Sequence, residues 1–322
     1  MIGWVRSLRA SCSGLCNMLR TGGCAVAVSL VGVAAPAGPL GLGTMAPGTL
    51  SHSTGMAIAG VMTERGGPEI RVLPNAGEAV LLELLAEGEL DFAVANAMET
   101  YRAAAGTGED RLAVAALLYP LQVGLFVRKD SDIASVADLA GRRVTAGYAA
   151  SPAIAQLLAA LLAAGGLSGE SIEPVNVSDL VTGADRFSDG RADAFFFALG
   201  AAKLAEIAAT VPIRLLPLPG GADAQARARA VAPVVYITTV APRPNLAGVM
   251  DPTPVLTFDN LLVTRTDTSA EAVDAILGTL IESRQALIDR LPVFAGFDAS
   301  GFDDPRPGVP FHPAALARAA RP

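Results

Sequence analysis

The chain has 322 residues, of which 52% are hydrophobic and 17% are charged, and its formal net charge is −7. This length and composition suffice for one large or two medium α/β domains with a buried core. An acidic balance without a basic stripe argues against nucleic acid as a partner.

The first 37 residues differ in composition from the rest of the chain. Their only charges are three arginines, and they end in a short apolar run, Cys24–Ala37. A positive segment, an apolar run and small residues at its end are typical of a secretory signal peptide. A membrane anchor is the alternative, but the run is too short to span a bilayer comfortably. We therefore expect residues 1–37 to be a signal peptide that is removed on export to the periplasm.

The distribution of cysteine restricts the chemistry of the exported chain. All three cysteines lie in the predicted signal peptide, so the mature protein would have no disulfide, thiolate metal site or cysteine nucleophile. The sequence also has no phosphate loop, nucleophile elbow or metal-ligand spacing. We expect neither a cofactor nor a metal.

Helical and strand patterns alternate along the remaining residues. The expected helices are 56–64, 78–87, 153–164, 180–188, 201–209 and 269–290, with a short one in 131–141. The expected strands are 70–74, 91–96, 112–119, 123–128, 172–177, 192–199, 213–218, 234–240 and 255–265, with another that begins at 142. Alternation of this kind predicts an α/β fold with a parallel-rich, doubly wound sheet.

A local echo predicts two lobes. Gly88-Glu-Leu-Asp91 precedes one strand and Gly190-Arg-Ala-Asp193 precedes another, and each follows a strand, a polar turn and an amphipathic helix. Glycine at a helix end and aspartate at a strand start are also ordinary turn chemistry. We expect lobe I to consist of 38–122 and 217–322, and lobe II of 123–216, with a hinge between them.

Ligands of open α/β sheets bind at the carboxyl ends of the strands, where helices begin. In this sequence those ends are the segments 44–53, 75–78, 96–99, 147–151 and 199–203. In the segment that precedes the helix 153–164, Ser151 is a suitable N-cap and Pro152 suits the first helical position. A small-residue loop at a helix N-terminus leaves free amides and a partial positive charge, which favour an anion.

Several short motifs follow one another in a fixed order from about Leu42 to Arg318. They are the glycine-rich loop 43–49, the unit 75–93, the segments 117–120, 125–131 and 135–144, the positions 147 and 151, the segments 189–200 and 214–218, and the C-terminal 309–313. In this order the chain resembles the TAXI-type periplasmic solute receptors of TRAP transporters.

The resemblance implies a two-lobed periplasmic-binding-protein-like fold and a role in transport. Such a receptor captures a small solute, often a carboxylate or an acidic amino acid, and delivers it to an ion-gradient-driven TRAP membrane permease. We expect a monomer and no catalysis. Three alternatives stay open: a receptor linked to a membrane sensor, one linked to an ATP-driven (ABC) pump, and an enzyme on the same fold, which would need His52 to face an acid.

The residues expected to contact the solute are polar or flexible positions at the strand ends. They are Thr44, Gly48, Thr49, His52, Asn75, Asn96, Gly147, Ala150, Ser151 and Lys203. For the threonines and serines of the first loop, helix capping is an equal alternative, and for Lys203 a surface position is the alternative.

Several expected contact positions depart from the family pattern. Ser51, His52 and Ser53 replace two tyrosines and a proline of the first loop, and Glu78 stands where a neutral polar residue is usual. An acidic residue in a first helical turn favours the helix dipole. If Glu78 faced the solute instead, it would select a solute that carries an amine.

Overall fold

The computed structural model describes residues 38–47, 49–75, 77–107, 111–149, 152–297 and 308–320. Gly38–Pro322 is one compact unit. The predicted signal peptide lies outside the described residues, as do the expected contact residues Gly48, Ala150 and Ser151.

The strands of the described residues form one ten-stranded sheet. The strands are β1 (Leu40–Met45), β2 (Ile70–Asn75), β3 (Phe92–Asn96), β4 (Leu112–Arg128), β5 (Arg143–Gly147), β6 (Glu173–Val177), β7 (Ala194–Ala198), β8 (Ile213–Leu215), β9 (Tyr236–Val240) and β10 (Thr253–Arg265). The α-helices are α1 (Leu50–Glu64), α2 (Glu78–Glu87), α3 (Ala97–Thr107), α4 (Pro152–Ala164), α5 (Leu180–Ser188), α6 (Ala202–Thr210), α7 (Ala222–Val231), α8 (Ala270–Glu282), α9 (Arg284–Arg290) and α10 (Pro313–Ala319). Short 3-10 helices are η1 (Val136–Leu139), η2 (Gly169–Ser171) and η3 (Pro292–Gly296).

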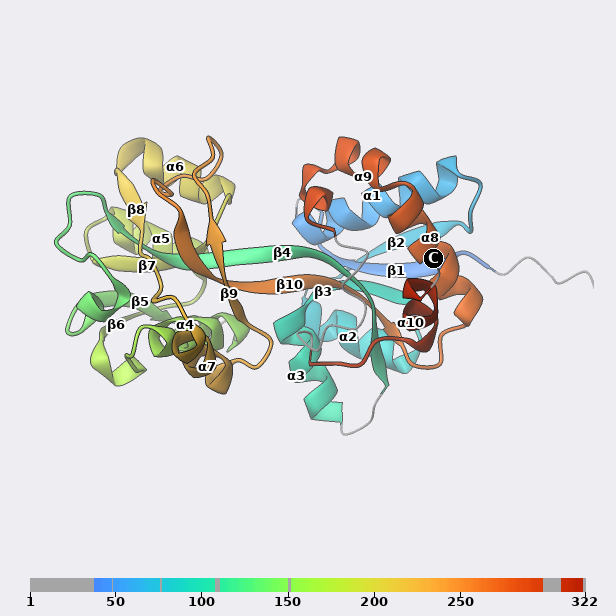
Figure 1. The fold of residues 1–322 in the computed structure, drawn as a ribbon, viewed down its shortest axis with the longest axis horizontal. Helices are drawn as coiled ribbons and strands as arrows, with labels where there is room; N and C mark the ends of the chain where they lie inside the picture. The colour runs from blue at the N-terminus through green and yellow to red at the C-terminus, as the bar shows by residue number, and fades with distance from the viewer. Residues whose placement is uncertain are drawn as a thin grey trace, which may run out of the picture. The chain divides into compact units, whose positions relative to one another are not determined.

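The sheet consists of two parallel groups joined by two long antiparallel strands. Its order is β2-β1-β3-β10-β4-β7-β5-β6, with β9 paired to β10 and β8 to β4. The pairs β1–β2, β1–β3, β5–β6 and β5–β7 are parallel. β4 and β10 are antiparallel to each other and run through both groups (Figure 1). We call the part around β1–β3 the first lobe and the part around β5–β7 the second lobe.

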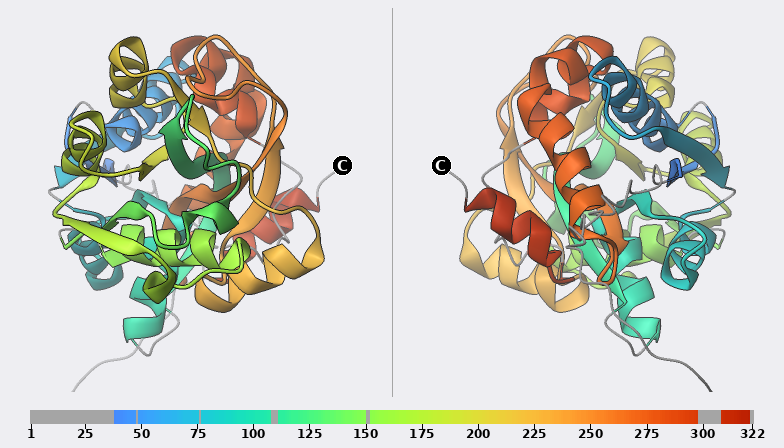
Figure 2. Two further views of the ribbon diagram at one scale, coloured as in Figure 1. Left: turned by 90° about the vertical axis from the view of Figure 1, so that its left-hand side faces the viewer. Right: turned by 90° about the vertical axis from the view of Figure 1, so that its right-hand side faces the viewer.

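Helices pack on both faces of each lobe. In the first lobe, α1 and α8 lie side by side on one face (Figure 2) and α2 packs on the other. In the second lobe, α4 and α7 cover one face and α5 and α6 the other. One apolar cluster, which includes side chains of α2, α4 and α7, extends across both lobes. Within the described part of the chain, no helix has the length and apolar character needed to cross a membrane.

Helix α1 begins earlier than expected. We expected a loop up to residue 55, but the helix starts at Leu50, and Thr49 caps it by accepting a hydrogen bond from the His52 amide at 3.2 Å. Ser53 and Thr54 donate their hydroxyls to backbone carbonyls one turn back, which satisfies both side chains inside the helix. His52 therefore lies in the first turn of a helix, in a fixed position.

Two other elements differ from the expected pattern. β4 is one continuous strand, whereas we expected two strands, 112–119 and 123–128, separated at Pro120. Proline is tolerated there because β7 joins β4 only from Val123 onward, so one edge of the strand is open at Pro120. Conversely, the expected helix 269–290 is broken at Ser283, a residue of low helix propensity whose hydroxyl accepts a hydrogen bond from Arg65 at 2.7 Å.

Residues 217–252 pack with the second lobe. This differs from our expectation that 217–322 belongs to lobe I. Arg227 of α7 donates to the carbonyls of Ala163 and Ala164 at the end of α4, at 3.0 and 2.7 Å. β9 pairs with the part of β10 that lies in the second lobe. Ala224 and Ala228 of α7 are buried where this helix packs against α4. The chain returns to the first lobe along β10, whose second half pairs with β3.

The echoed Gly–Asp turns have the same function in the two lobes. Asp91 accepts a hydrogen bond from the amide of Gly41 at 2.7 Å, and its own amide donates to the Gly41 carbonyl at 3.0 Å. Asp193 makes the same pair of bonds with Arg143, at 3.0 and 2.7 Å. The glycine that opens each turn has a positive φ. Each turn thus ties the start of its strand to the start of the neighbouring strand.

Replacing Asp193 should show how much this tie contributes. Its carboxylate also accepts from the Arg143 guanidinium at 2.6 Å, and this bond holds the pKa of Asp193 below its ordinary value. We expect Asp193→Ala to lower the free energy of unfolding by about 1–3 kcal/mol at pH 7. A carboxyl group with a lowered pKa loses its contribution as the pH falls, so the difference should shrink below about pH 4.

Urea unfolding at pH 7 and pH 3 measures both effects. Asp189→Ala, in the same turn but exposed and without a described hydrogen bond from its side chain, is the control. We expect its effect to stay within about 0.5 kcal/mol. An Asp193→Ala protein as stable as the parent at pH 7 would contradict the proposed tie.

Candidate functional site

The strand directions bring the carboxyl ends of the two parallel groups toward each other. β4 runs from the first lobe into the second, β3 runs the same way through its pairing with β10, and β7 runs back. Tyr119 of β4 lies opposite Asn260, which pairs with Asn96 at the end of β3. Four residues further, Val123 lies opposite Ala198 at the end of β7, a separation of about 13 Å. Helices α1–α6 begin at these strand ends, as ligand sites of such sheets require.

His52 and Thr44 contact each other at the end of β1. The Oγ1 atom of Thr44 lies 3.1 Å from Nδ1 of His52 and donates to the Met45 carbonyl at 3.0 Å. Because the hydroxyl has one proton, we infer that His52 Nδ1 donates to Thr44. The ring is then fixed, and within the described residues its Nε2 has no hydrogen-bond partner. Thr44 itself is fully buried. Nε2 of His52 is therefore the atom of this pair that a solute can contact.

Two other expected contact residues of the first lobe hold the backbone. Thr49 accepts from the His52 amide and donates to the Ala46 carbonyl at 2.7 Å, which is the capping role. Asn75 donates to the Leu73 carbonyl at 3.0 Å within its own strand end. These contacts fix the loops around the strand ends.

Asn96 joins two helix starts. Its Oδ1 accepts from the Glu99 amide at 2.9 Å and so caps α3, and its Nδ2 donates to Oε2 of Glu78 in the first turn of α2. Asn96 is therefore a positioning residue that holds the carboxyl group of Glu78 at the strand ends.

Glu78 has the most unusual electrostatic environment at these strand ends. Burial raises its pKa from 4.5 to about 7, the hydrogen bond from Asn96 lowers it, and repulsion from Glu99 raises it further. The first turn of a helix would by itself lower the pKa of an acid, so burial outweighs the helix dipole. A carboxyl group near its titration point at neutral pH, located where ligands bind in this kind of sheet, is a functional candidate.

A buried polar network that the sequence did not reveal lies beside these residues. The Tyr119 hydroxyl is 2.7 Å from Oγ1 of Thr54 and accepts from Nδ2 of Asn260 at 2.7 Å. All three side chains are buried, and burial raises the pKa of Tyr119, with a smaller contribution from Glu78. The residues come from α1, β4 and β10, so only the folded sheet brings them together.

In the second lobe, the loop after β5 presents backbone more than side chains. Gly147 and Tyr148 both have positive φ angles, of 85° and 44°. The Tyr148 ring is fully buried and its hydroxyl lies 2.8 Å from Oγ1 of Thr145. Ala150 and Ser151, the strongest sequence-based candidates, lie outside the described residues, and α4 begins at Pro152.

The helix starts of the second lobe differ in how far they are capped. Asp179 caps α5 by accepting from the Thr182 amide at 2.9 Å, and hydrogen bonds led by that from Ser178 lower its pKa to about 2. α6 follows Ala201, which offers no side-chain cap. The first amides of α6 are therefore open to an acceptor from outside, whereas α5 already has a carboxylate of its own.

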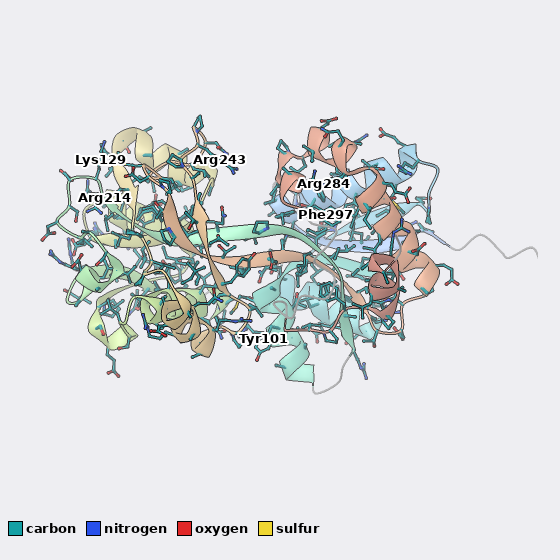
Figure 3. All side chains as sticks on the ribbon, viewed as in Figure 1. Tyr101, Lys129, Arg214, Arg243, Arg284 and Phe297 are labelled. Carbon is teal, nitrogen blue, oxygen red and sulfur yellow. The ribbon has the colours of Figure 1, made fainter. Side chains whose placement is uncertain are left out.

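Lys203 is paired within the second lobe. Its ammonium lies 2.9 Å from Asp185 and 2.8 Å from Glu206, and these two carboxylates satisfy the charge that we had expected to bind a solute. Figure 3 shows other cations of the two lobes: Arg243 on the loop after β9, and Arg284 at the start of α9. The Arg284 guanidinium donates to the carbonyls of Ala295 and Phe297.

The site has no metal-binding constellation among the described residues, and His52 has no acidic partner there. Its first-lobe side offers a titrating carboxyl group and an imidazole nitrogen, and its second-lobe side offers free backbone amides. Such an arrangement can bind a small polar solute through charge and hydrogen bonds.

Comparison with known proteins gives the same picture of the fold. A family model described as the NMT1-like family matches residues 42–317. Similar solved structures include the periplasmic aliphatic sulphonate binding protein SsuA from Escherichia coli, at 19% identity and a TM-score of 0.53, covering 89% of this chain and 84% of that one. A TctC solute binding protein from Polaromonas is 15% identical with a TM-score of 0.54, covering 82% and 91%. This likeness shows the two-lobed periplasmic-binding-protein-like fold that the sequence predicted.

The raised pKa of Glu78 predicts a pH-dependent stability. Between pH 4.5 and about 7 the folded protein keeps a proton that the unfolded chain releases. The stabilising contribution is therefore complete below about pH 4.5 and is lost as the pH rises through 7. Glu78→Gln keeps an acceptor for Asn96 and removes the charge. We expect it to match the parent near pH 4.5 and to be more stable by about 1–3 kcal/mol at pH 8.

Urea unfolding across this pH range measures the difference. Glu83→Gln is the matched control, since Glu83 is exposed on the same helix. Its effect should stay within about 0.5 kcal/mol at every pH. A stability gain for Glu78→Gln that does not grow with pH would contradict the raised pKa.

Proposed function

The chain belongs to the NMT1-like family, and we propose that it is an extracytoplasmic receptor that captures a small carboxylate-bearing solute between its lobes and delivers it to a TRAP-type membrane permease. The observation that carries the proposal is that strand ends and helix starts from both lobes face each other along the middle of the β4–β10 pair. A solute bound there would contact both lobes at once.

The fold supports a binding role. The similar structures are described as a periplasmic sulphonate binding protein and a TctC solute binding protein. By analogy with them, this chain would bind a solute outside the cytoplasm, after removal of residues 1–37. The permease type rests on the ordered motifs shared with the TAXI-type receptors. Dependence of solute uptake on an ion gradient, and not on ATP, would support it.

The carboxylate preference rests on the free helix amides. One helix N-terminus contributes about 0.3–2 kcal/mol to the binding of an anion, whereas micromolar affinity requires about −8 kcal/mol. Several groups must therefore converge. The amides at the start of α6 can supply part from the second lobe, and Nε2 of His52 can accept a hydrogen bond from a donor group of the solute in the first lobe.

A receptor fits the described side chains better than an enzyme. General acid–base catalysis by His52 would need a partner that orients the ring and balances its charge. The hydroxyl of Thr44 orients the ring here, without a carboxylate within the described residues. This geometry suits hydrogen bonding to a solute.

A thermal-shift screen tests the proposal. The purified protein is heated with carboxylates, both with and without an amine, and with uncharged polyols as controls. A bound solute at one hundred times its dissociation constant stabilises by about 2.7 kcal/mol, so we expect at least one carboxylate to raise the melting temperature by several degrees. If none does, the carboxylate preference fails, and if no compound does, the receptor role loses its support.

The contribution of His52 can be measured with the best carboxylate from that screen. We expect His52→Ala to weaken binding about three- to tenfold, because a hydrogen bond between the protein and the solute contributes about 0.5–1.5 kcal/mol. Met56→Ala, on the same helix and 52% exposed, should leave the affinity unchanged. Equal affinity of His52→Ala and the parent in calorimetry would remove His52 from the site.

A further inference from the structure

The carboxyl group of Glu78 is held in place, and among the described residues no opposite charge pairs with it. Asn96 fixes Oε2, while Oε1 has no hydrogen-bond partner within the described residues. The side chain is half-buried at the start of α2, whose N-cap, Gly77, offers no side chain. One carboxylate oxygen therefore remains available at the end of β3.

The charged groups on the elements packed against α2 do not neutralise Glu78. The charged residues of α3 are Glu99, which repels it, and Arg102, which lies 3.8 Å from Glu99. β1 and β3 carry no charged residue, and Arg71 of β2 is exposed. On β10, Arg265 donates to the Leu90 carbonyl beyond the other end of α2.

Two further polar groups of the described residues lie on the neighbouring strands β10 and β4. The Asp259 carboxylate of β10 accepts from the Tyr236 hydroxyl at 2.8 Å. The pKa of the Tyr119 hydroxyl of β4 is raised by burial and, to a smaller extent, by Glu78. The pKa of Glu78 is therefore determined by burial, by one hydrogen bond from an amide and by the like charge of Glu99. A half-buried carboxylate loses part of its hydration, and a cation or a strong donor beside it compensates for that loss.

We propose that Glu78 sets the charge of the solute: the site takes a solute that carries a protonated amine, whose ammonium pairs with Glu78, and discriminates against the same acid without the amine. This inference rests on the proposed receptor function and specifies its solute class. It also explains why an acid stands at a strand end where a plain carboxylate would be repelled.

The rest of the site is compatible with such a solute. The open amides at the start of α6 lie at the end of β7, about 13 Å from the end of β3 along β4. A solute with an amine at one end and a carboxylate at the other can therefore use the two lobes differently. The ammonium contacts Glu78 in the first lobe, and the carboxylate points to the second.

A competition experiment tests the proposal. The purified protein is mixed with pairs that share a carbon skeleton: 4-aminobutyrate with butyrate, L-glutamate with glutarate, and L-alanine with propionate. Bound compounds are separated from free ones by rapid gel filtration and identified by mass spectrometry. We expect the bound fraction to be enriched in an amine over its partner by at least about tenfold, as for a charge pair removed from water.

Two variants show whether Glu78 causes the enrichment. Glu78→Gln keeps the hydrogen bond to Asn96 and should bring the amine preference to within about twofold, while Glu83→Gln should keep the parent's preference. Capture of a carboxylate without its amine partner would overturn the proposal but leave the receptor function intact. Capture of no compound would overturn both, and an amine preference that survives in Glu78→Gln would overturn the role of Glu78.

The pH dependence gives an independent check. Burial raises the pKa of Glu78 to about 7, and pairing with an ammonium requires the ionised form. The affinity for the captured amine should therefore rise about tenfold between pH 6 and pH 8 in the parent and stay flat in Glu78→Gln. An affinity that falls over this range would contradict an ammonium at Glu78.

Discussion

The antiparallel pair β4–β10 is the interaction on which the rest of the structure depends. Each strand contributes one end to the first lobe and the other end to the second, and all the other described strands join the sheet through one of the two. The register of the pair shifts between Asn260 and Leu261, near the place where the lobes meet. The Tyr119 hydroxyl forms hydrogen bonds with Asn260 and Thr54 at this point. The buried polar side chains at the register shift are therefore paired. If the lobes move relative to each other, these two strands must absorb the change.

The same pair determines the chemistry of the site. β3 and β7 flank the β4–β10 pair and run in opposite directions. The carboxyl ends of both parallel groups therefore face each other near the middle of this pair. The strand pairing also places Asn96 beside Asn260 and Tyr119. These surroundings are polar but carry no cation within the described residues. The titration behaviour of Glu78 follows from this position, since burial and like charge act together there.

Local rules predicted much of the fold. The bounds of α2 and α5 agree with the sequence because each has a clear start and end, such as Gly88 with its positive φ. The echo of Asp91 and Asp193 also predicted a real equivalence, because a short turn determines which backbone amide each carboxylate can reach. The early start of α1 was missed because the Thr49 cap lies among glycine and proline residues that usually indicate a loop.

The site was less predictable because its decisive contacts join distant residues. Glu206, three residues from Lys203, is a local partner, but Asp185 lies eighteen residues away, and no local pattern shows that it also pairs with the lysine. Likewise, nothing near Tyr148 in the sequence shows that its ring turns into the core and leaves backbone at the surface. For Glu78 the local rule favoured a helix-dipole role, which would lower its pKa, and tertiary burial reversed the sign.

In the proposed receptor the two lobes contribute unequally to recognition. The second lobe offers mainly backbone amides, which favour any acceptor and discriminate little among anions, because the amide geometry does not depend on the side chains. The first lobe offers the carboxyl group of Glu78 and the imidazole of His52, each fixed by a neighbour. A site that combines weak general attraction from one lobe with a single uncompensated charge from the other gains its selectivity from that charge. Under the proposed function, affinity depends on both lobes, while the identity of the solute depends chiefly on the environment of Glu78.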